Sequence, residues 1–298
     1  MFNMLSQSLP DFDALWDYSH PEQTELKFRE VLLQIPEDDP ALLELLTQIA
    51  RAQGLQRKFE KAHQTLDQVE RRLGSVASRP RVRYLLERGR VLNSSGDPDR
   101  ARTFFNQALD LAVQLKEDFY SVDALHMLAI VAPPGRSLDL NLQAIRMAES
   151  SAEERARNWL GSLYNNTGWA YHDMGEYDKA LETFQKAEAF RRSKGSVRET
   201  RIAVWCVASA LRSLGRVEEA LSRQMALKDE LEAAGESDGF VFEEIGECLL
   251  ALNRPKEARL FFVRAHELLS QDRSLVEHEP ERLARLKTLG DGNFSTFS

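Results

Sequence analysis

Residues 164–190 read YNNTGWAYHDMGEYDKALETFQKAEAF and carry the pattern that decides the fold. Gly168 is the small residue of the pattern, Tyr171 its aromatic residue and Gly175 its turn glycine. The apolar residues after the turn are Ala180, Phe184 and Ala187. Their offsets of three and four residues place them on one face of each of two helices separated by a turn. The stretch therefore predicts an antiparallel helical hairpin, whose first and second helices we call helix A and helix B.

The same phrase recurs along the chain. Two further strong copies contain Gly89, Leu92, Gly96, Ala101, Phe105 and Ala108, and Gly246, Leu249, Asn253, Ala258, Phe262 and Ala265. Including three weaker copies, the small residue of helix A falls at positions 50, 89, 129, 168, 208 and 246, a period of 38–40 residues. A fixed period of this length is the signature of a structural repeat. The small residue and the alanines let two helices approach closely, and the aromatic ring fills the remaining space.

This pattern resembles the tetratricopeptide repeat, most specifically in GRVLNSSGDPDRARTFFNQAL (89–109) and GWAYHDMGEYDKALETFQKA (168–187), and the resemblance covers about residues 22–270. The family period is about 34 residues, so the longer period implies longer helices, similar to those of kinesin light chains and bacterial peptide sensors. The resemblance implies an all-α fold. We expect a right-handed superhelical solenoid of antiparallel helix pairs, with about six repeats, a terminal half-repeat and a capping helix.

The repeat phase also predicts the organisation of the chain. We expect an acidic N-terminal segment with a half-repeat helix at 1–40, six repeats at 41–270, a capping helix at 271–290 and a disordered tail at 291–298. The capping helix is expected over 275–289, because the ends of a solenoid need a cover with a polar outer face.

Composition and charge narrow the function. The chain is 43% hydrophobic and 29% charged, so it can bury a core, and its net charge of −8 disfavours nucleic acid as a partner. Ten acidic residues lie before residue 46 against only Lys27 and Arg29, whereas 51–110 holds thirteen Lys and Arg against seven Asp and Glu. Two solvated faces or a functional electropositive patch would both produce this distribution.

Several features point to the cytoplasm. The only two cysteines, Cys206 and Cys248, fall inside helical patterns, which fits reduced thiols rather than a disulfide framework. The N-terminus lacks the basic start and apolar run of a signal peptide, and no stretch approaches 18 apolar residues. We therefore expect a cytoplasmic protein without a membrane partner.

The motifs of catalysis and cofactor binding are absent from the sequence. There is no Gly-rich phosphate loop, GxSxG, HExxH or CxxC, and the six histidines have no metal-ligand spacing. We accordingly expect no cofactor, no metal and no enzymatic activity.

A groove lined by the A helices is the predicted binding surface, since stacked pairs expose the A-helix residues that lie off the core face. The candidate contacts are Arg83, Arg90, Asn93, His126, Asn165, Asn166, Trp169, His172, Trp205 and Arg212. Trp169 and Trp205 would be rigid apolar anchors, although each could instead tilt into the core between helices. Arg83 and Arg90 would receive either an acidic peptide or the acidic residues 11–39 of the chain itself.

The function expected from these features is a non-enzymatic scaffold or adaptor that binds a protein or peptide in the groove. The alternative is a regulatory sensor whose superhelix closes on a small peptide. The sequence leaves open whether the protein forms a homo-oligomer.

Overall fold

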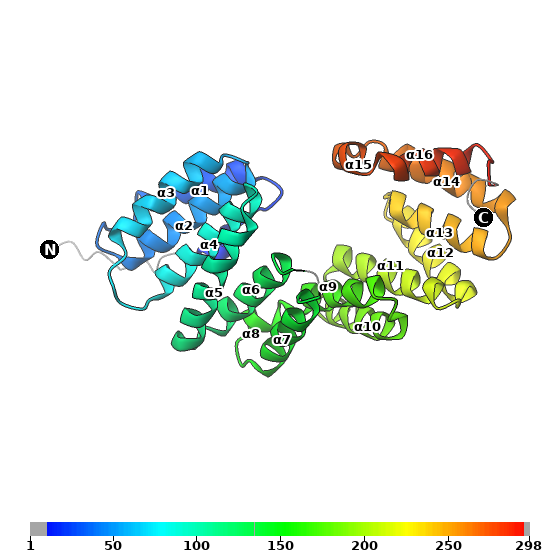
Figure 1. The fold of residues 1–298 in the computed structure, drawn as a ribbon. Coiled ribbons are helices and arrows are strands. Elements are labelled where there is room, and N and C mark those ends of the chain that lie inside the picture. Colours follow the sequence, from blue (N-terminus) through cyan, green and yellow to red (C-terminus); the bar gives the residue numbers. More distant parts are fainter. Residues whose placement is uncertain (1–10, 134, 295–298) are drawn as a thin grey trace. The chain divides into compact units, whose positions relative to one another are not determined.

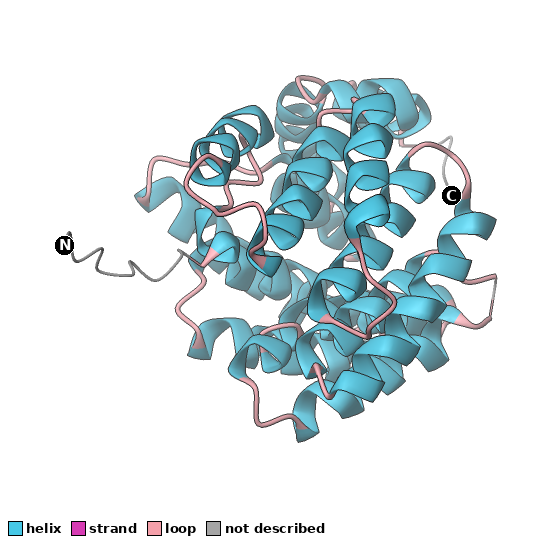
Figure 2. Ribbon diagram, turned by 90° about the vertical axis from the view of Figure 1, so that its left-hand side faces the viewer, coloured by secondary structure: helices cyan, strands magenta, loops and turns pink. Residues whose placement is uncertain are grey.

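The computed structural model describes residues 11–133 and 135–294, and over these residues the chain forms helices and turns without any strand (Figures 1 and 2). The all-α repeat architecture is thus confirmed. The chain divides between Trp159 and Leu160 into two compact units, which we call unit 1 and unit 2.

Unit 1 contains a short 3-10 helix, η1, and eight α-helices. Their bounds are η1 (Phe12–Leu15), α1 (Pro21–Leu32), α2 (Pro40–Leu55), α3 (Phe59–Arg72), α4 (Arg79–Ser94), α5 (Pro98–Leu115), α6 (Asp118–Ile130), α7 (Ser137–Ser150) and α8 (Glu154–Arg157). Helices α2 and α3, α4 and α5, and α6 and α7 pack as hairpins, and α4 contacts both α2 and α6. The A helices of successive repeats are therefore neighbours.

Unit 2 repeats this arrangement. Its helices are α9 (Leu160–Asp173), α10 (Tyr177–Ser193), α11 (Val197–Ser213), α12 (Val217–Ala233), α13 (Gly239–Ala251), α14 (Pro255–Leu269), α15 (Arg273–His278) and α16 (Pro280–Gly290). Here α11 contacts both α9 and α13, and α16 packs against α14.

A contact between a glycine of helix A and a phenylalanine of helix B is the centre of each strong repeat. Phe105, Phe184 and Phe262 are completely buried. A Cβ atom added to Gly168 would lie 2.4 Å from the ring of Phe184, and Gly89 faces Phe105 at the same distance. The ring therefore occupies the space that any larger residue on helix A would need.

The repeat built from α11 and α12 departs from this rule. Ala208 takes the place of the glycine, and Gln224 stands sixteen residues later, where the strong repeats have phenylalanine. Gln224 is fully buried and its Nε2 donates to the backbone carbonyl of Trp205, while its Oε1 has no partner among the described residues. A polar side chain thus lies beneath the helix turn that carries Trp205.

The C-terminal cap differs from the single helix expected over 275–289. It forms two helices, α15 and α16, which meet at Glu279 and Pro280. Proline has no amide hydrogen and its ring clashes with the preceding turn, so it begins a new helix more readily than it continues one. Leu283, Leu286 and Leu289 are buried on one face of α16.

Other expectations about the ends and the overall form remain predictions. In the C-terminal segment, Phe294 packs against the core of unit 2, and residues 295–298, like 1–10 at the other end, lie outside the described residues. The domain boundaries and the right-handed superhelix are likewise untested.

We predict that Gly168→Ala destabilises the fold by about 1–3 kcal/mol, because the new methyl group would collide with the Phe184 ring. This direction is informative, since glycine to alanine inside a helix otherwise stabilises by about 0.5–1 kcal/mol. Urea unfolding followed by circular dichroism measures the change. Gly54→Ala in α2 is the matched control, because this glycine is also helical and its added Cβ would lie 3.4 Å from Val91, an ordinary van der Waals distance. Equal unfolding midpoints for the two variants would contradict the packing rule.

Candidate functional site

Arg83 in unit 1 is not available as an open groove cation. Its side chain on α4 is buried and pairs with Glu44 of α2, at 3.1 Å, and with Asp13 of η1. Burial alone would lower its pKa, but the neighbouring carboxylates and Tyr120 raise that pKa above the usual value. Of the two alternatives for this arginine, the structure has the second: an acidic residue from 11–39 occupies it. Asp13 also pairs with Arg155.

Arg90 has a similar environment further along α4. It pairs with Glu87, at 2.6 Å, and with Asp123 of α6. Burial would lower the pKa of Arg90, but these two carboxylates raise it. Arg90 and Asn93 line a pocket of about 160 Å³ with Glu87. His126 lies apart from that pocket against Trp159, with ring centroids 5.0 Å apart, and burial lowers its pKa.

Arg212 in unit 2 also has an internal partner. Its Nε lies 2.5 Å from Glu244 of α13, a residue that is almost fully buried. Burial raises the pKa of Glu244, against the opposing effect of Arg212. A hydrogen bond of 2.9 Å joins a ring nitrogen of His172 to the hydroxyl of Ser213. Burial lowers the pKa of His172. These predicted groove residues therefore bind neighbouring A helices to each other.

The two tryptophans meet, but their environments differ. The Trp169 and Trp205 ring centroids are 5.6 Å apart. Trp169 packs edge-on against Phe184 at 5.1 Å, at the margin of the core. Trp205 donates from Nε1 to the carbonyl of Phe240, at 3.0 Å, and forms one wall of a pocket. Trp169 thus lies at the margin of the core and Trp205 lines a pocket, while their role as anchors for a ligand stays a prediction.

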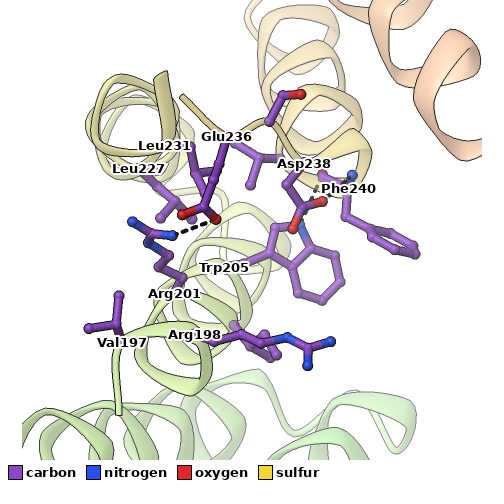
Figure 3. Close-up of a pocket in the computed structure, with 12 residues that line it drawn as sticks. Val197, Arg198, Arg201, Trp205, Leu227, Leu231, Glu236, Asp238 and Phe240 are labelled. Carbon is purple, nitrogen blue, oxygen red and sulfur yellow. Dashed lines mark hydrogen bonds and ion pairs between the residues drawn. The ribbon is translucent and has the colours of Figure 1, made fainter. Parts of the chain in front are cut away.

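A pocket that we call the Trp205 pocket has a volume of about 640 Å³ and opens between the N-terminal half of α11, the end of α12 and the start of α13 (Figure 3). Its lining residues are Val197, Arg198, Arg201, Ile202, Trp205, Leu227, Leu231, Glu236, Ser237, Asp238, Phe240 and Val241. Arg201 pairs with Glu236 at 3.0 Å and with Glu230 at 2.8 Å. Asp238 accepts from the backbone amide of Phe240 and caps α13. The carboxylates of the pocket are thus already engaged.

A second pocket of about 180 Å³, which we call the Arg191 pocket, lies beside the first, because Ile202 lines both. Its other lining residues are Gly161, Ser162, Asn165, Asn166, Ala187, Arg191, Glu199 and Ala203. Arg191 donates to the hydroxyl of Ser162, at 3.0 Å, and Asn165 Oδ1 accepts from the thiol of Cys206. Burial raises the pKa of Cys206 to about 12, so that thiol remains protonated.

The two pockets occupy the same place in successive repeats. Ser162, Asn165, Ala187 and Arg191 of the Arg191 pocket stand forty residues before Ile202, Trp205, Leu227 and Leu231 of the Trp205 pocket. One repeat thus presents small and polar side chains where the next presents large apolar ones.

The sequence prediction found Asn165, Asn166 and Trp205 and missed the rest of the two pockets. Most of the missing residues lie in the first two turns of the A helices α9, α11 and α13, and the others belong to the B helices α10 and α12 and to the loop 236–238. Two signals were present: the repeat of α11 and α12 lacks its phenylalanine, and the loop 234–238 that leads into α13 is longer than the three-residue turns at 95–97, 174–176 and 252–254.

Within 11–133 and 135–294, no helix is long and apolar enough to cross a membrane. The same residues hold no cluster of three His, Cys, Asp or Glu side chains that could bind a metal ion. Cys206 and Cys248 are both buried and free.

Comparison with known proteins identifies the repeat. Residues 47–114 and 156–193 match models of the tetratricopeptide repeat. Among solved structures, the apo form of RapI aligns with a TM-score of 0.73 and 13% identity over 95% of this chain and 80% of its own. A signal-transduction ATPase with a tetratricopeptide repeat sensor from Pyrococcus horikoshii aligns with a TM-score of 0.69 and 14% identity, over 89% of this chain and 41% of its own. NprR in complex with its cognate peptide NprX aligns with a TM-score of 0.54 and 14% identity, over 96% of this chain and 83% of its own. No curated protein shows significant sequence similarity to the chain.

We predict that Arg212→Leu destabilises unit 2 by about 3–5 kcal/mol, because it leaves Glu244 buried without its partner. The loss should shrink as the pH falls towards about 4, since a protonated Glu244 can be buried without charge. Denaturant unfolding at several pH values measures both effects. The double variant Arg212→Leu with Glu244→Leu should recover most of the stability. A double variant as unstable as the single one would mean that Arg212 acts through some other contact.

Proposed function

We propose that this tetratricopeptide-repeat protein is a non-enzymatic scaffold that binds a peptide segment of a partner at the Trp205 pocket. The observation that carries the proposal is the pocket itself, because it has room for a large side chain and an apolar wall formed by Trp205, Leu227 and Leu231. Pockets of this size and character are where proteins hold the anchoring side chain of a ligand.

The rest of the predicted groove supports the choice of this pocket. Arg83, Arg90 and Arg212 are committed to internal ion pairs, and a ligand would have to break those pairs to use them. The Trp205 pocket needs no such change, since the hydrogen bond from Trp205 to Phe240 and the ion pair from Arg201 to Glu236 hold its wall in place. A preformed site costs less conformational entropy on binding.

The structural neighbours favour a peptide as the ligand class. NprR was solved with its cognate peptide, and the Pyrococcus horikoshii protein carries a repeat domain that is described as a sensor. The same neighbours keep the alternative function, a peptide-responsive regulator, as a second proposal for this chain. Both proposals use one binding site and differ in the effect that the bound peptide has on the protein.

We predict that Ile202→Gln weakens binding of peptides selected from a displayed library of short random sequences by about 1–2 kcal/mol. Ile202 is 46% exposed at the edge of the pocket, so a polar side chain there removes apolar contact without disturbing the core. Fluorescence polarisation with the selected peptides gives the affinities.

Leu260→Gln on α14 is the matched control. Leu260 is 73% exposed and lines neither pocket, so the same polar change should leave peptide affinity unaltered. Equal affinities for the two variants would show that the selected peptides bind elsewhere. A library that yields no binder to the wild-type protein would overturn the proposed function.

A further inference from the structure

Two adjacent pockets with opposite chemistry indicate what kind of peptide unit 2 would hold. The Trp205 pocket has large apolar side chains at the four positions where the Arg191 pocket has Ser162, Asn165, Ala187 and Arg191. Ile202 belongs to both linings, so one continuous ligand can enter both.

The Arg191 pocket is rich in hydrogen-bond donors. The guanidinium of Arg191 lies directly over Gly161, where an added Cβ would be 2.3 Å from its Nε, and one of its amino groups reaches Ser162. Asn165 uses its oxygen for the Cys206 thiol, which leaves its amide NH₂ free to donate. Glycine at position 161 is what permits the guanidinium to lie so close to α9.

The arginines of the chain differ in whether they already have a carboxylate partner. Arg191 and Arg198 make no ion pair with a described residue, whereas Arg83, Arg90, Arg201 and Arg212 all do. The linings of the two pockets together hold three arginines, Arg191, Arg198 and Arg201, and three carboxylates, Glu199, Glu236 and Asp238, so their formal charges balance. Because Glu236 pairs with Arg201, the guanidinium groups of Arg191 and Arg198 are the ones left for a ligand carboxylate.

We propose that unit 2 recognises a peptide in which an acidic residue stands close to a large apolar one, with the carboxylate in the Arg191 pocket and the apolar side chain in the Trp205 pocket. This inference rests on the proposed function and specifies its ligand. The guanidinium of Arg191 donates one hydrogen bond, to Ser162, and keeps further donors for a carboxylate, whose ionised hydrogen bonds are shorter and stronger than neutral ones. The volume of about 180 Å³ fits an Asp or Glu side chain rather than a folded partner.

The test uses the selected peptides, resynthesised with each acidic residue replaced by its amide. Glu→Gln or Asp→Asn in the peptide should raise Kd by about tenfold, as expected for loss of a charge-assisted hydrogen bond. The difference should be largest at low salt.

Protein variants locate the effect. Arg191→Gln should abolish the preference for acid over amide and retain sensitivity to Ile202→Gln, and Arg191→Lys should restore part of the preference. Arg192→Gln is the matched control, because it removes the same charge from the neighbouring residue, which pairs with Glu188 and lines neither pocket. Thermal melting of each variant confirms that it is folded.

The outcomes separate this inference from the function on which it rests. Some peptides could bind more weakly to Ile202→Gln and yet have the same Kd in their acid and amide forms. That result would support the Trp205 pocket as a binding site and overturn the carboxylate site. An equal loss of preference in Arg191→Gln and Arg192→Gln would overturn it too, since general charge would then explain the binding. A library that yields no binder overturns both proposals.

Discussion

The close contact of Gly168 with Phe184, and its copies at Gly89 and Gly246, is the constraint on which the structure depends. A phenylalanine ring takes the space of the absent side chain, so helix A and helix B approach until the ring is completely enclosed. This contact fixes the distance between the helices of a hairpin and thereby the positions from which the next hairpin can stack. Where the ring is missing, at Gln224, the repeat instead buries a polar amide beneath Trp205, and the Trp205 pocket opens nearby.

Ion pairs between successive A helices form a second layer of organisation. Arg83 with Glu44, Arg90 with Asp123, and Arg212 with Glu244 each join a residue to one on the neighbouring A helix. A buried pair of this kind adds little net stability compared with apolar side chains, but removing one partner is costly, so it fixes which repeats stack on which. The same pairing leaves few charges for a ligand. The proposed recognition accordingly uses Arg191, a pocket residue without such a partner.

Repetition explains how one fold can provide two different pockets side by side. The backbone offers the same recess in consecutive repeats, and the residues that line it are not needed for the glycine–phenylalanine contact. They can therefore differ freely, as Arg191 and Leu231 do at equivalent positions. In the proposed recognition, a ligand that spans both recesses would be selected by the order of its side chains. Specificity would then come from pairing an apolar anchor with a charged one, because a peptide that lacks either leaves a pocket badly filled.

The sequence by itself determined the helical hairpin, its period and the buried face of each helix, because these depend on local spacing and on the volume available at Gly168 and Phe184. It also picked out Asn165, Asn166 and Trp205, which line the two pockets. It could not show that Arg83, Arg90 and Arg212 are neutralised, since their partners on other helices lie 32 to 70 residues away and the pairing depends on how the hairpins stack. Nor could it reveal the two pockets, whose walls come from three helices each. A recess exists only once those helices are packed, so the tertiary structure alone decided where it opens and which side chains line it.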